Sequence, residues 1–393
     1  MKPPYGLTLL LRRSLWIAPL LGFFPARGDV ATLPTTRYAV AGLSEPVEIL
    51  VDRWGVPHVY APTMYAAYFA QGFNAARDRL WQIDLWRKRG LGELARDFGP
   101  AYVEQDRATR LFLYRGDMHA EWIAYSSDTK RVAENFVAGI NAYVALTRVQ
   151  PGLLSPEFKL LGYAPAMWQA ADIVRIRSHG LVSNLPSEVA RARVAAVADL
   201  STDLLRRSVG PRWRTSVPAG LNPAEVPESV LQDYNLARDP VAFTVDKLRG
   251  TEPPGRKGRA ELEHALDRPA YASNNFTVGP ARSLTGRPIL ANDPHRAHGV
   301  PSLRYFAHLS APGFDVIGAG EPFLPGVSLG HNAELAFGLT VFAIDQEDLY
   351  VYETNPANPN QYKYKGGWED VKVIKDSIKV KGEAQPVAVE LKY

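Results

Sequence analysis

The sequence predicts an α/β protein of the α+β kind, in which a mostly helical first part precedes a strand-rich second part. Three observations support this fold class. Apolar residues recur at helical spacing from Thr63 to about Gly90, residues 246–272 have linker composition, and apolar and polar residues alternate from Gln361 to Tyr393. With 46% hydrophobic and 22% charged residues among 393, the chain has enough apolar material for a large core.

The mostly helical part is expected to cover residues 29–245. It begins with two short strands within residues 47–60, which turn at Gly55. The long helix from Thr63 follows, because apolar side chains repeat every three to four residues there. Further helical stretches are expected near residues 101–125, 128–147 and 168–209.

Residues 246–272 combine Gly, Pro and charged residues, which is the composition of a linker. After Ala272 the sequence changes to short strands separated by Gly and Pro. Because the last apolar alternation reaches Tyr393 with no turn after it, we expect the second part, residues 273–393, to be truncated at its C-terminus. The expected strands are 276–278, 288–291, 314–317 and 335–340, followed by hairpin-paired strands at 371–373, 378–381 and 387–393.

Residues 1–28 have the pattern of a secretory signal peptide. Lys2 and the Arg12-Arg13 pair precede an apolar run over residues 15–24, and small residues follow before Asp29. The run is too short to cross a bilayer comfortably, and the arginine pair is typical of twin-arginine export. We therefore expect a periplasmic or secreted protein with no membrane association after signal removal.

Composition excludes several classes of function. The chain has no cysteine, which excludes disulfides, thiolate metal sites and cysteine nucleophiles. Its formal net charge is +4, and no run of Lys and Arg is interleaved with aromatic residues as a nucleic-acid groove requires. We therefore expect no nucleic-acid partner.

Ser273 lies where the linker ends and the strand-rich part begins. A lone serine before two asparagines is ordinarily a turn residue. Its surroundings make it a candidate nucleophile, because further motifs follow in a fixed order. The set is Ser273-Asn-Asn-Phe276, Gly286-x-Pro-Ile-Leu-Ala-Asn-Asp-Pro-His295, Pro325-Gly-Val-x-x-Gly-His-Asn332 and Asp345-x-x-Asp348-Leu-Tyr350.

Together with upstream blocks at residues 53–59, 72–87 and 92–95, this ordered set resembles the penicillin acylase family of N-terminal-nucleophile hydrolases. That family includes penicillin, cephalosporin and acyl-homoserine-lactone acylases. The resemblance implies a four-layer αββα sandwich, incomplete in this chain, and a precursor that cuts itself immediately before Ser273. Its own two subunits, α-like (29–245) and β (from Ser273), would then remain partners, while the spacer 246–272 would be removed.

The resemblance also implies how such a site works. A serine hydroxyl needs a base, and cleavage would give Ser273 a free α-amine with a pKa of about 8 that can take the hydroxyl proton. No Ser-His-Asp triad is then required. By position in the family, the N–H of Val341 would donate to the oxyanion, and His295 would orient or tune the amine. Asn274 would support the oxyanion of self-cleavage, although alone it suggests only an Asx turn.

Asp345 and Asp348 offer hard oxygen ligands three residues apart, which suits Ca²⁺. Two acids in a loop are usually only solvated. The resemblance adds the backbone carbonyl of Glu347 and a glutamate of the first subunit, for which Glu188 is the candidate. We therefore expect one structural calcium ion that joins the two subunits and takes no part in the chemistry.

The resemblance implies hydrolysis of a linear amide that carries an apolar acyl group, such as an N-acyl-homoserine lactone or a β-lactam. The aromatic residues Phe323, Phe337 and Phe342 are candidates to line the acyl site. Charged residues of the long helix are read as structural, because spacings of three and four favour ion pairs between them. They are Arg77, Asp78, Arg79, Asp84 and Arg87.

Two alternatives remain open. One is an exported, non-catalytic binding protein, or an inactive fragment, that keeps the fold. The other is a metal-dependent hydrolase, for which the chain offers His295, His298, Asp293 and Asp345 but no H-E-x-x-H pattern.

Overall fold

A computed structural model describes residues 34–176, 184–206, 215–249, 273–295, 299–340 and 346–393. The chain divides into two units, residues 1–39 and 40–393. The described residues of the first unit, 34–39, contain no helix or strand, so every element named below belongs to the second unit. The predicted signal peptide and residues 250–272 of the predicted linker lie outside the described residues.

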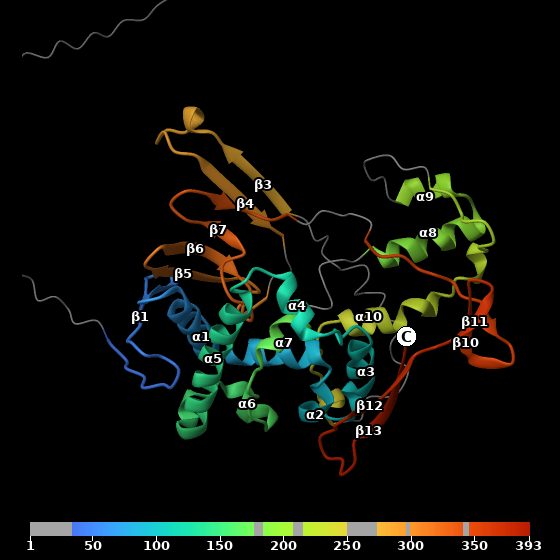
Figure 1. The fold of residues 1–393 in the computed structure, drawn as a ribbon, viewed down its shortest axis with the longest axis horizontal. Helices are drawn as coiled ribbons and strands as arrows, with labels where there is room; N and C mark the ends of the chain where they lie inside the picture. Colours follow the sequence, from blue (N-terminus) through green and yellow to red (C-terminus); the bar gives the residue numbers. More distant parts are fainter. Residues whose placement is uncertain (1–33, 177–183, 207–214, 250–272, 296–298, 341–345) are drawn as a thin grey trace, which may run out of the picture. The chain divides into compact units, whose positions relative to one another are not determined.

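Helices dominate the first part of the second unit (Figure 1). The α-helices are α1 Met64–Leu91, α2 Leu94–Phe98, α3 Val103–Leu111, α4 Met118–Ala124, α5 Thr129–Val149, α6 Pro156–Leu161, α7 Ala170–Arg175, α8 Leu185–Val197, α9 Leu200–Arg206, α10 Gln232–Arg238 and α11 Val245–Arg249. Short 3₁₀ helices are η1 Pro100–Tyr102, η2 Pro151–Leu153, η3 Pro223–Glu225, η4 Glu228–Leu231 and η5 Pro280–Arg282.

Strands open the unit and dominate its second part. They are β1 Glu48–Val51, β2 Pro57–Tyr60, β3 Ser273–Val278, β4 Ile289–Pro294, β5 Tyr305–Ala311, β6 Phe314–Gly320, β7 Leu329–His331, β8 Ala336–Phe337, β9 Thr354–Asn355, β10 Asn358–Tyr364, β11 Gly367–Asp370, β12 Val373–Ile378 and β13 Val387–Lys392. They form four sheets, with the orders β1-β2-β5-β6-β7-β8, β11-β10-β9, β12-β13 and β3-β4.

The long helix α1 confirms the predicted helix from Thr63. The Thr63 hydroxyl accepts a hydrogen bond from the N–H of Ala66 at 3.1 Å, which caps the first turn. Gly92 ends the helix in the left-handed conformation at φ 65°, where a side chain would be strained. Both signals are local, which explains why these boundaries could be predicted.

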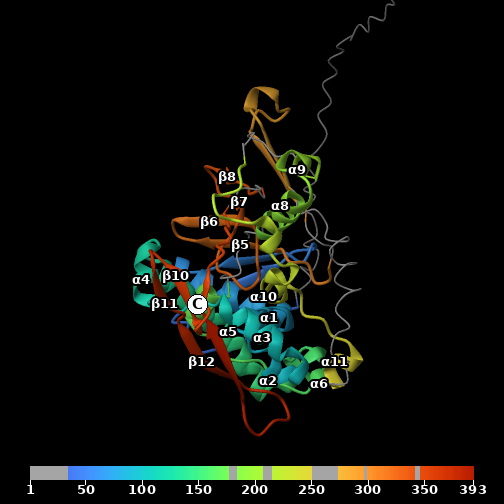
Figure 2. The same ribbon diagram turned by 90° about the vertical axis from the view of Figure 1, so that its right-hand side faces the viewer.

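Helices α1 and α5 lie side by side and approach closely at two glycines (Figures 1 and 2). A Cβ added to Gly72 would lie 2.0 Å from the carbonyl oxygen of Phe136. One added to Gly139 would lie 1.9 Å from the carbonyl oxygen of Phe69. The backbones are therefore packed too closely at this crossing for any side chain larger than hydrogen.

The six-stranded sheet joins the beginning of the unit to its strand-rich part. Strand β2 pairs with β5 in parallel, with His58 opposite His308. Alternate residues of β5, Tyr305, Ala307 and Leu309, are buried in a cluster with residues of α1 such as Ala70. One face of this sheet is thus covered by α1, and elements from both sides of the predicted cleavage point share one core.

Polar contacts of Gln71 and Asp78 help to attach α1 to the strand-rich part. The side-chain amide of Gln71 donates to the carbonyl oxygen of Gly326 and accepts from its N–H, both at 2.8 Å. The hydroxyl of Tyr305 donates to a carboxylate oxygen of Asp78 at 2.9 Å, and burial raises the pKa of this tyrosine. The Gln71 contact explains the Pro325-Gly326 motif, because the turn with Gly326 at φ 91° leaves both backbone groups open to the amide.

The C-terminal hairpin β12–β13 packs on α2 and η1, where Ile378 and Val389 join a core cluster with Leu94 and Tyr102. The start of α2 is held by the buried carboxylate of Asp106, which accepts from the N–H groups of Leu94 at 2.9 Å and Ala95 at 2.7 Å. Burial raises the pKa of Asp106 to about 7.

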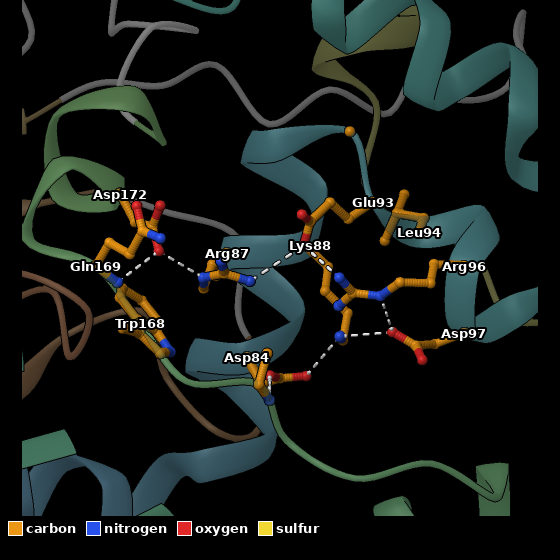
Figure 3. Close-up of polar contacts among 12 residues, drawn as sticks. Asp84, Arg87, Lys88, Glu93, Leu94, Arg96, Asp97, Trp168, Gln169 and Asp172 are labelled. Atoms are coloured by element: carbon orange, nitrogen blue, oxygen red, sulfur yellow. Dashed lines mark hydrogen bonds and ion pairs between the residues drawn. The ribbon is translucent and has the colours of Figure 1, made fainter. Parts of the chain in front are cut away.

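Charged side chains at the end of α1 form a buried network (Figure 3). The ammonium of Lys88 lies 2.6 Å from Asp97 and 3.6 Å from Asp84. The carboxylate of Asp84 also accepts from the hydroxyl of Tyr163 at 3.1 Å, and burial raises its pKa.

Arg87 extends the network to α7. It bonds Asp172 at 2.7 Å and Glu93 at 3.1 Å. The prediction that the charges of α1 are structural fits these contacts, but the expected pairing among them is largely wrong. Most partners come from other elements because these side chains point into the protein, where helix spacing does not select the partner.

The α+β class and the helical first part are confirmed. The described strands form four sheets, and α1 covers one face of the six-stranded sheet, whereas the four-layer αββα sandwich stays a prediction. The strand predicted at 378–381 is wrong, because β12 ends at Ile378 and the chain then turns. Asp376 interrupts the apolar–polar alternation of β12, because it lies between Ile374 and Ile378 on the inward face, where it forms an ion pair with Arg110 at 3.1 Å. No helix in the described ranges is long and apolar enough to cross a membrane.

Candidate active site

The strands β3 and β4 form an antiparallel hairpin whose open end carries Ser273. In its register Ser273 lies opposite Pro294, Asn274 opposite Asp293, and Asn275 opposite Asn292. The first residue of β3 is therefore beside the last residue of β4. His295 follows directly, so 21 intervening residues of hairpin bring it to the level of Ser273–Asn274, where it contacts the side chain of Asn274.

The imidazole of His295 contacts two side chains through Nε2. This atom lies 2.9 Å from a carboxylate oxygen of Asp293 and 3.3 Å from the amide nitrogen of Asn274. One ring nitrogen cannot both donate to a carboxylate and accept from an amide N–H, so the hydrogen bond is the shorter contact, in which Nε2 donates to Asp293. The hairpin thus brings together three of the residues in the predicted motifs, and Asp293 is the partner that sequence reasoning did not assign to His295.

The two faces of the hairpin carry different side chains. Because residues alternate along a strand, Ser273 shares a face with Asn275 and Asn292, whereas Asn274 and Asp293 point to the opposite face. His295 contacts the two residues of that second face. The face of the candidate nucleophile Ser273 therefore also carries two asparagines, which the sequence motifs contain but do not single out.

Asn292 connects the hairpin to the segment that follows β8. Its amide nitrogen donates to the carbonyl oxygen of Leu339 at 3.0 Å and to that of Asn274 at 3.4 Å. Gly338 lies against Asn275 and Asn292, since a Cβ added there would be 2.6 Å from the amide nitrogen of Asn275 and 2.9 Å from the Cγ of Asn292. In the sequence, the only sign of these contacts is the Ala-Asn-Asp-Pro-His motif, which contains Asn292.

Val341, the predicted oxyanion donor, lies outside the described residues. The described range 299–340 ends at Thr340, the residue after Leu339, whose carbonyl oxygen accepts from Asn292. The role of Val341 stays a prediction.

The residues of the predicted calcium site are only partly described, since Asp345 lies outside the described ranges. The carboxylate of Glu188 is bonded by Arg191 at 2.8 and 2.9 Å. That of Glu347 accepts from the hydroxyl of Tyr234 at 2.9 and 3.0 Å. Among the residues that the structure describes, no group of three His, Asp or Glu side chains could hold a metal ion.

The segments that carry these residues nevertheless meet. The side-chain oxygen of Asn184 accepts hydrogen bonds from the N–H groups of Gln346 at 3.1 Å and Glu347 at 3.0 Å. Its amide nitrogen donates to the carbonyl oxygen of Glu347 at 2.9 Å. Asp348 is exposed. The described residues alone do not fit a calcium site, because both glutamates are occupied by protein donors and the Glu347 carbonyl is taken by Asn184. A calcium ion here stays a prediction that depends on Asp345.

Of the three aromatic residues expected to line the acyl site, the two that the structure describes differ in burial. Phe323 is buried and stacks on Trp86 with ring centroids 4.3 Å apart, so it belongs to the core. Phe337 is exposed on β8, next to Gly338. Phe342 lies outside the described residues, as do His298 and Asp345 of the metal-hydrolase alternative, of which the structure brings together only His295 and Asp293.

Comparisons with known proteins agree with the motifs. The family model described as penicillin amidase matches residues 46–393. The chain is 31% identical over 350 residues to penicillin acylase 2 proenzyme from Pseudomonas sp., covering 88% of this chain and 42% of that protein. It is 29% identical over 366 residues to acyl-homoserine lactone acylase QuiP from Pseudomonas aeruginosa, covering 90% of this chain and 40% of that protein.

The chain thus spans about two fifths of the length of these curated relatives. A solved chain of thermostable penicillin G acylase from Alcaligenes faecalis is 26% identical, with a TM-score of 0.37. That alignment covers 44% of this chain and 98% of the solved chain.

Proposed function

This chain belongs to the penicillin amidase family, and on that premise we propose that Ser273 is the nucleophile of an amidohydrolase that acts on linear amides. The observation that carries the proposal is the position of Ser273 as the first residue of β3, at the open end of a hairpin that also ends in His295. A cut between residues 272 and 273 would free an α-amine at the edge of a strand that is already hydrogen-bonded in place.

The amine of Ser273 would serve as the base. In its neutral form it can take the proton of the Ser273 hydroxyl, through a water molecule, because the unperturbed pKa of an α-amine is about 8. The Oγ then attacks the amide carbonyl, and the tetrahedral oxyanion needs hydrogen-bond donors such as the N–H of Val341. The intermediate expels the amine product with one proton, and water hydrolyses the resulting ester of Ser273 to release the acid.

His295 would support this base from outside the reacting atoms. Its Nε2 is directed to Asp293 and Asn274, so the ring is held beside the residue that follows Ser273. A ring fixed in this way can orient the amine or a water molecule near it. Asn274 would stabilise the carbonyl oxygen of residue 272 as self-cleavage begins.

Substrates of this site would be amides with an apolar acyl group. The relatives named above are a penicillin acylase and an acyl-homoserine lactone acylase, so both amine classes are candidates. The word proenzyme in the name of the first relative supports a precursor that is processed. Export through the segment 1–28 belongs to the same proposal, since both parts of the chain would mature outside the cytoplasm.

The test is the fate of the bond before Ser273 in the full-length gene product. After expression, intact mass and N-terminal sequencing should find a polypeptide that begins at Ser273. Ser273→Ala should leave one uncut polypeptide without amidase activity on penicillin G or an N-acyl-homoserine lactone. Ser283→Ala, in the exposed turn after β3, is the matched control and should be cut normally. Normal cutting of Ser273→Ala would overturn the proposal.

A further inference from the structure

We infer that Asn292 is a positioning residue for the Ser273 nucleophile, an inference that depends on the proposed function. It acts by tying the hairpin that carries Ser273 to the six-stranded sheet at a fixed spacing. The evidence is the geometry of one side chain that touches both parts, together with the glycine that lets them meet.

The amide nitrogen of Asn292 donates to two backbone carbonyls, one in the β3–β4 hairpin and one in the segment that follows β8. One is Asn274 O, at 3.4 Å, in the residue directly after Ser273. The other is Leu339 O, at 3.0 Å, two residues after the end of β8. Strand β8 is paired to β7, with Gly330 opposite Phe337, so Leu339 follows the edge of the six-stranded sheet.

Gly338 makes this contact possible. A Cβ at this position would lie 2.6 Å from the amide nitrogen of Asn275 and 2.9 Å from the Cγ of Asn292. Both distances are below the separation that non-bonded heavy atoms tolerate, so a side chain here would push the segment away from the hairpin. Gly338 and Asn292 therefore form one close contact between the hairpin and the segment after β8, which is called the joint below.

The orientation of the Asn292 amide is set by its nitrogen. The side-chain oxygen is shielded from solvent and receives no hydrogen bond from any residue in the described part of the chain. The nitrogen must face the two carbonyls, because turning the group over would bring an oxygen against them. An aspartate of the same shape would therefore replace both attractions with repulsion.

The joint is relevant to the proposed reaction because side chains alternate between the two faces of the hairpin. Asn292 lies on the face of the hairpin to which Ser273 also points, two residue pairs away along the ladder. A change in the spacing between the hairpin and the segment after β8 would thus move the nucleophile relative to whatever the six-stranded sheet presents to the substrate. A misplacement of about 1 Å lowers the rate of a positioned reaction by about a hundredfold.

The experiment compares Asn292→Asp with Asn141→Asp in the full-length protein. Asn141 is the matched control, since its amide also bridges to backbone, donating to the carbonyl of Trp168 at 2.9 Å and accepting from its N–H at 2.8 Å. Gly338→Ala perturbs the same joint from the opposite side. Each variant is assayed for precursor cutting, for kcat and KM on one amide substrate, and for urea-induced unfolding.

Asn292→Asp and Gly338→Ala should lower kcat by about ten- to a hundredfold with KM changed by less than about threefold. Asn141→Asp should keep kcat within about twofold of the wild-type value, even if its unfolding midpoint falls as far as those of Asn292→Asp and Gly338→Ala. If either joint variant is cut too slowly for kcat to be measured, the half-time of precursor cutting replaces kcat as the readout, because the proposed function has the same hydroxyl attack in both steps.

Three results decide between the ideas. Ser273-dependent turnover with an unchanged kcat in Asn292→Asp overturns this inference and leaves the proposed function intact. An equal loss of kcat in Asn141→Asp also overturns it, because the effect would then be general destabilisation. A wild-type protein that is never cut before Ser273 overturns the proposed function, and this inference with it.

Discussion

Replacing Lys88 with methionine should expose how strongly the buried ion network stabilises the protein. Lys88 and Asp84 are both 0% exposed, and Asp97, the closer partner of the ammonium, is 18% exposed. Methionine keeps most of the length of the side chain and removes only the charge. It leaves the carboxylate of Asp84 fully buried, and that of Asp97 mostly buried, without the ammonium that both contact.

The expected loss follows from this burial. Removing one partner of a buried ion pair costs about 3–5 kcal/mol of unfolding free energy. Asp97 keeps a contact with Arg96 at 3.2 Å, and Asp84 keeps the hydroxyl of Tyr163, so we expect a value near the lower end, about 3 kcal/mol. Urea-induced unfolding at pH 7, followed by far-ultraviolet circular dichroism, measures the difference.

The matched control is Lys130→Met. Lys130 also pairs with an acid four residues along its helix, Glu134 at 3.7 Å, but both side chains are more than half exposed. Exposed pairs of this kind contribute about 0–1 kcal/mol. If Lys88→Met shifts the unfolding midpoint no more than Lys130→Met, the reasoning from burial is refuted.

The pH dependence of the same variant gives a second check. Burial raises the pKa of Asp84, and Lys88 opposes this, so removal of Lys88 should raise that pKa further. A carboxyl group whose folded pKa is raised adds stability below its unfolded pKa and loses it as pH rises through the folded pKa. The deficit of Lys88→Met should therefore shrink between pH 7 and pH 5, and a constant deficit would contradict the assignment to Asp84.

Two further predictions concern the helices. Gly139→Ala should lower the unfolding free energy by about 2 kcal/mol despite the better helix propensity of alanine, because its Cβ would meet the Phe69 carbonyl at 1.9 Å. Thermal melting measures this, and Gly152→Ala, where a Cβ meets nothing within 4 Å, should melt like the wild type. Asp106, whose pKa is raised to about 7, should contribute stability that is complete below about pH 4 and is lost as pH rises through 7. Melting curves from pH 4.5 to 8 should therefore show a steeper decline for the wild type than for Asp106→Asn, and parallel curves would refute this.

Elements with local signals were predictable from the sequence. The cap at Thr63, the left-handed Gly92 and the apolar repeat between them define α1 without any distant partner. The turn at Gly55 is likewise local, since the Asp52 carboxylate accepts from the N–H groups of Trp54 and Val56. Burial in tertiary structure then adds to preferences that the sequence already has.

Pairings between distant segments were not predictable in the same way. No feature of residues 57–60 indicates that their partner lies at residues 305–311, and β5 was not among the expected strands. The site shows the same limit. The motifs singled out Ser273 and His295, but the contact of Asn292 with Leu339 depends on how a hairpin meets a second sheet, which local spacing does not encode.

The parallel pairing of β2 with β5 sets the order in which this protein can be assembled. One strand precedes residue 273 and the other follows it, and α1 packs on both. An intact chain brings them together as an intramolecular event, whereas two separate pieces would have to find each other by diffusion. If the proposed cut preceded folding, it would turn a concentration-independent step into a bimolecular one, so the uncut chain would act as the template for a sheet that the two proposed subunits then share.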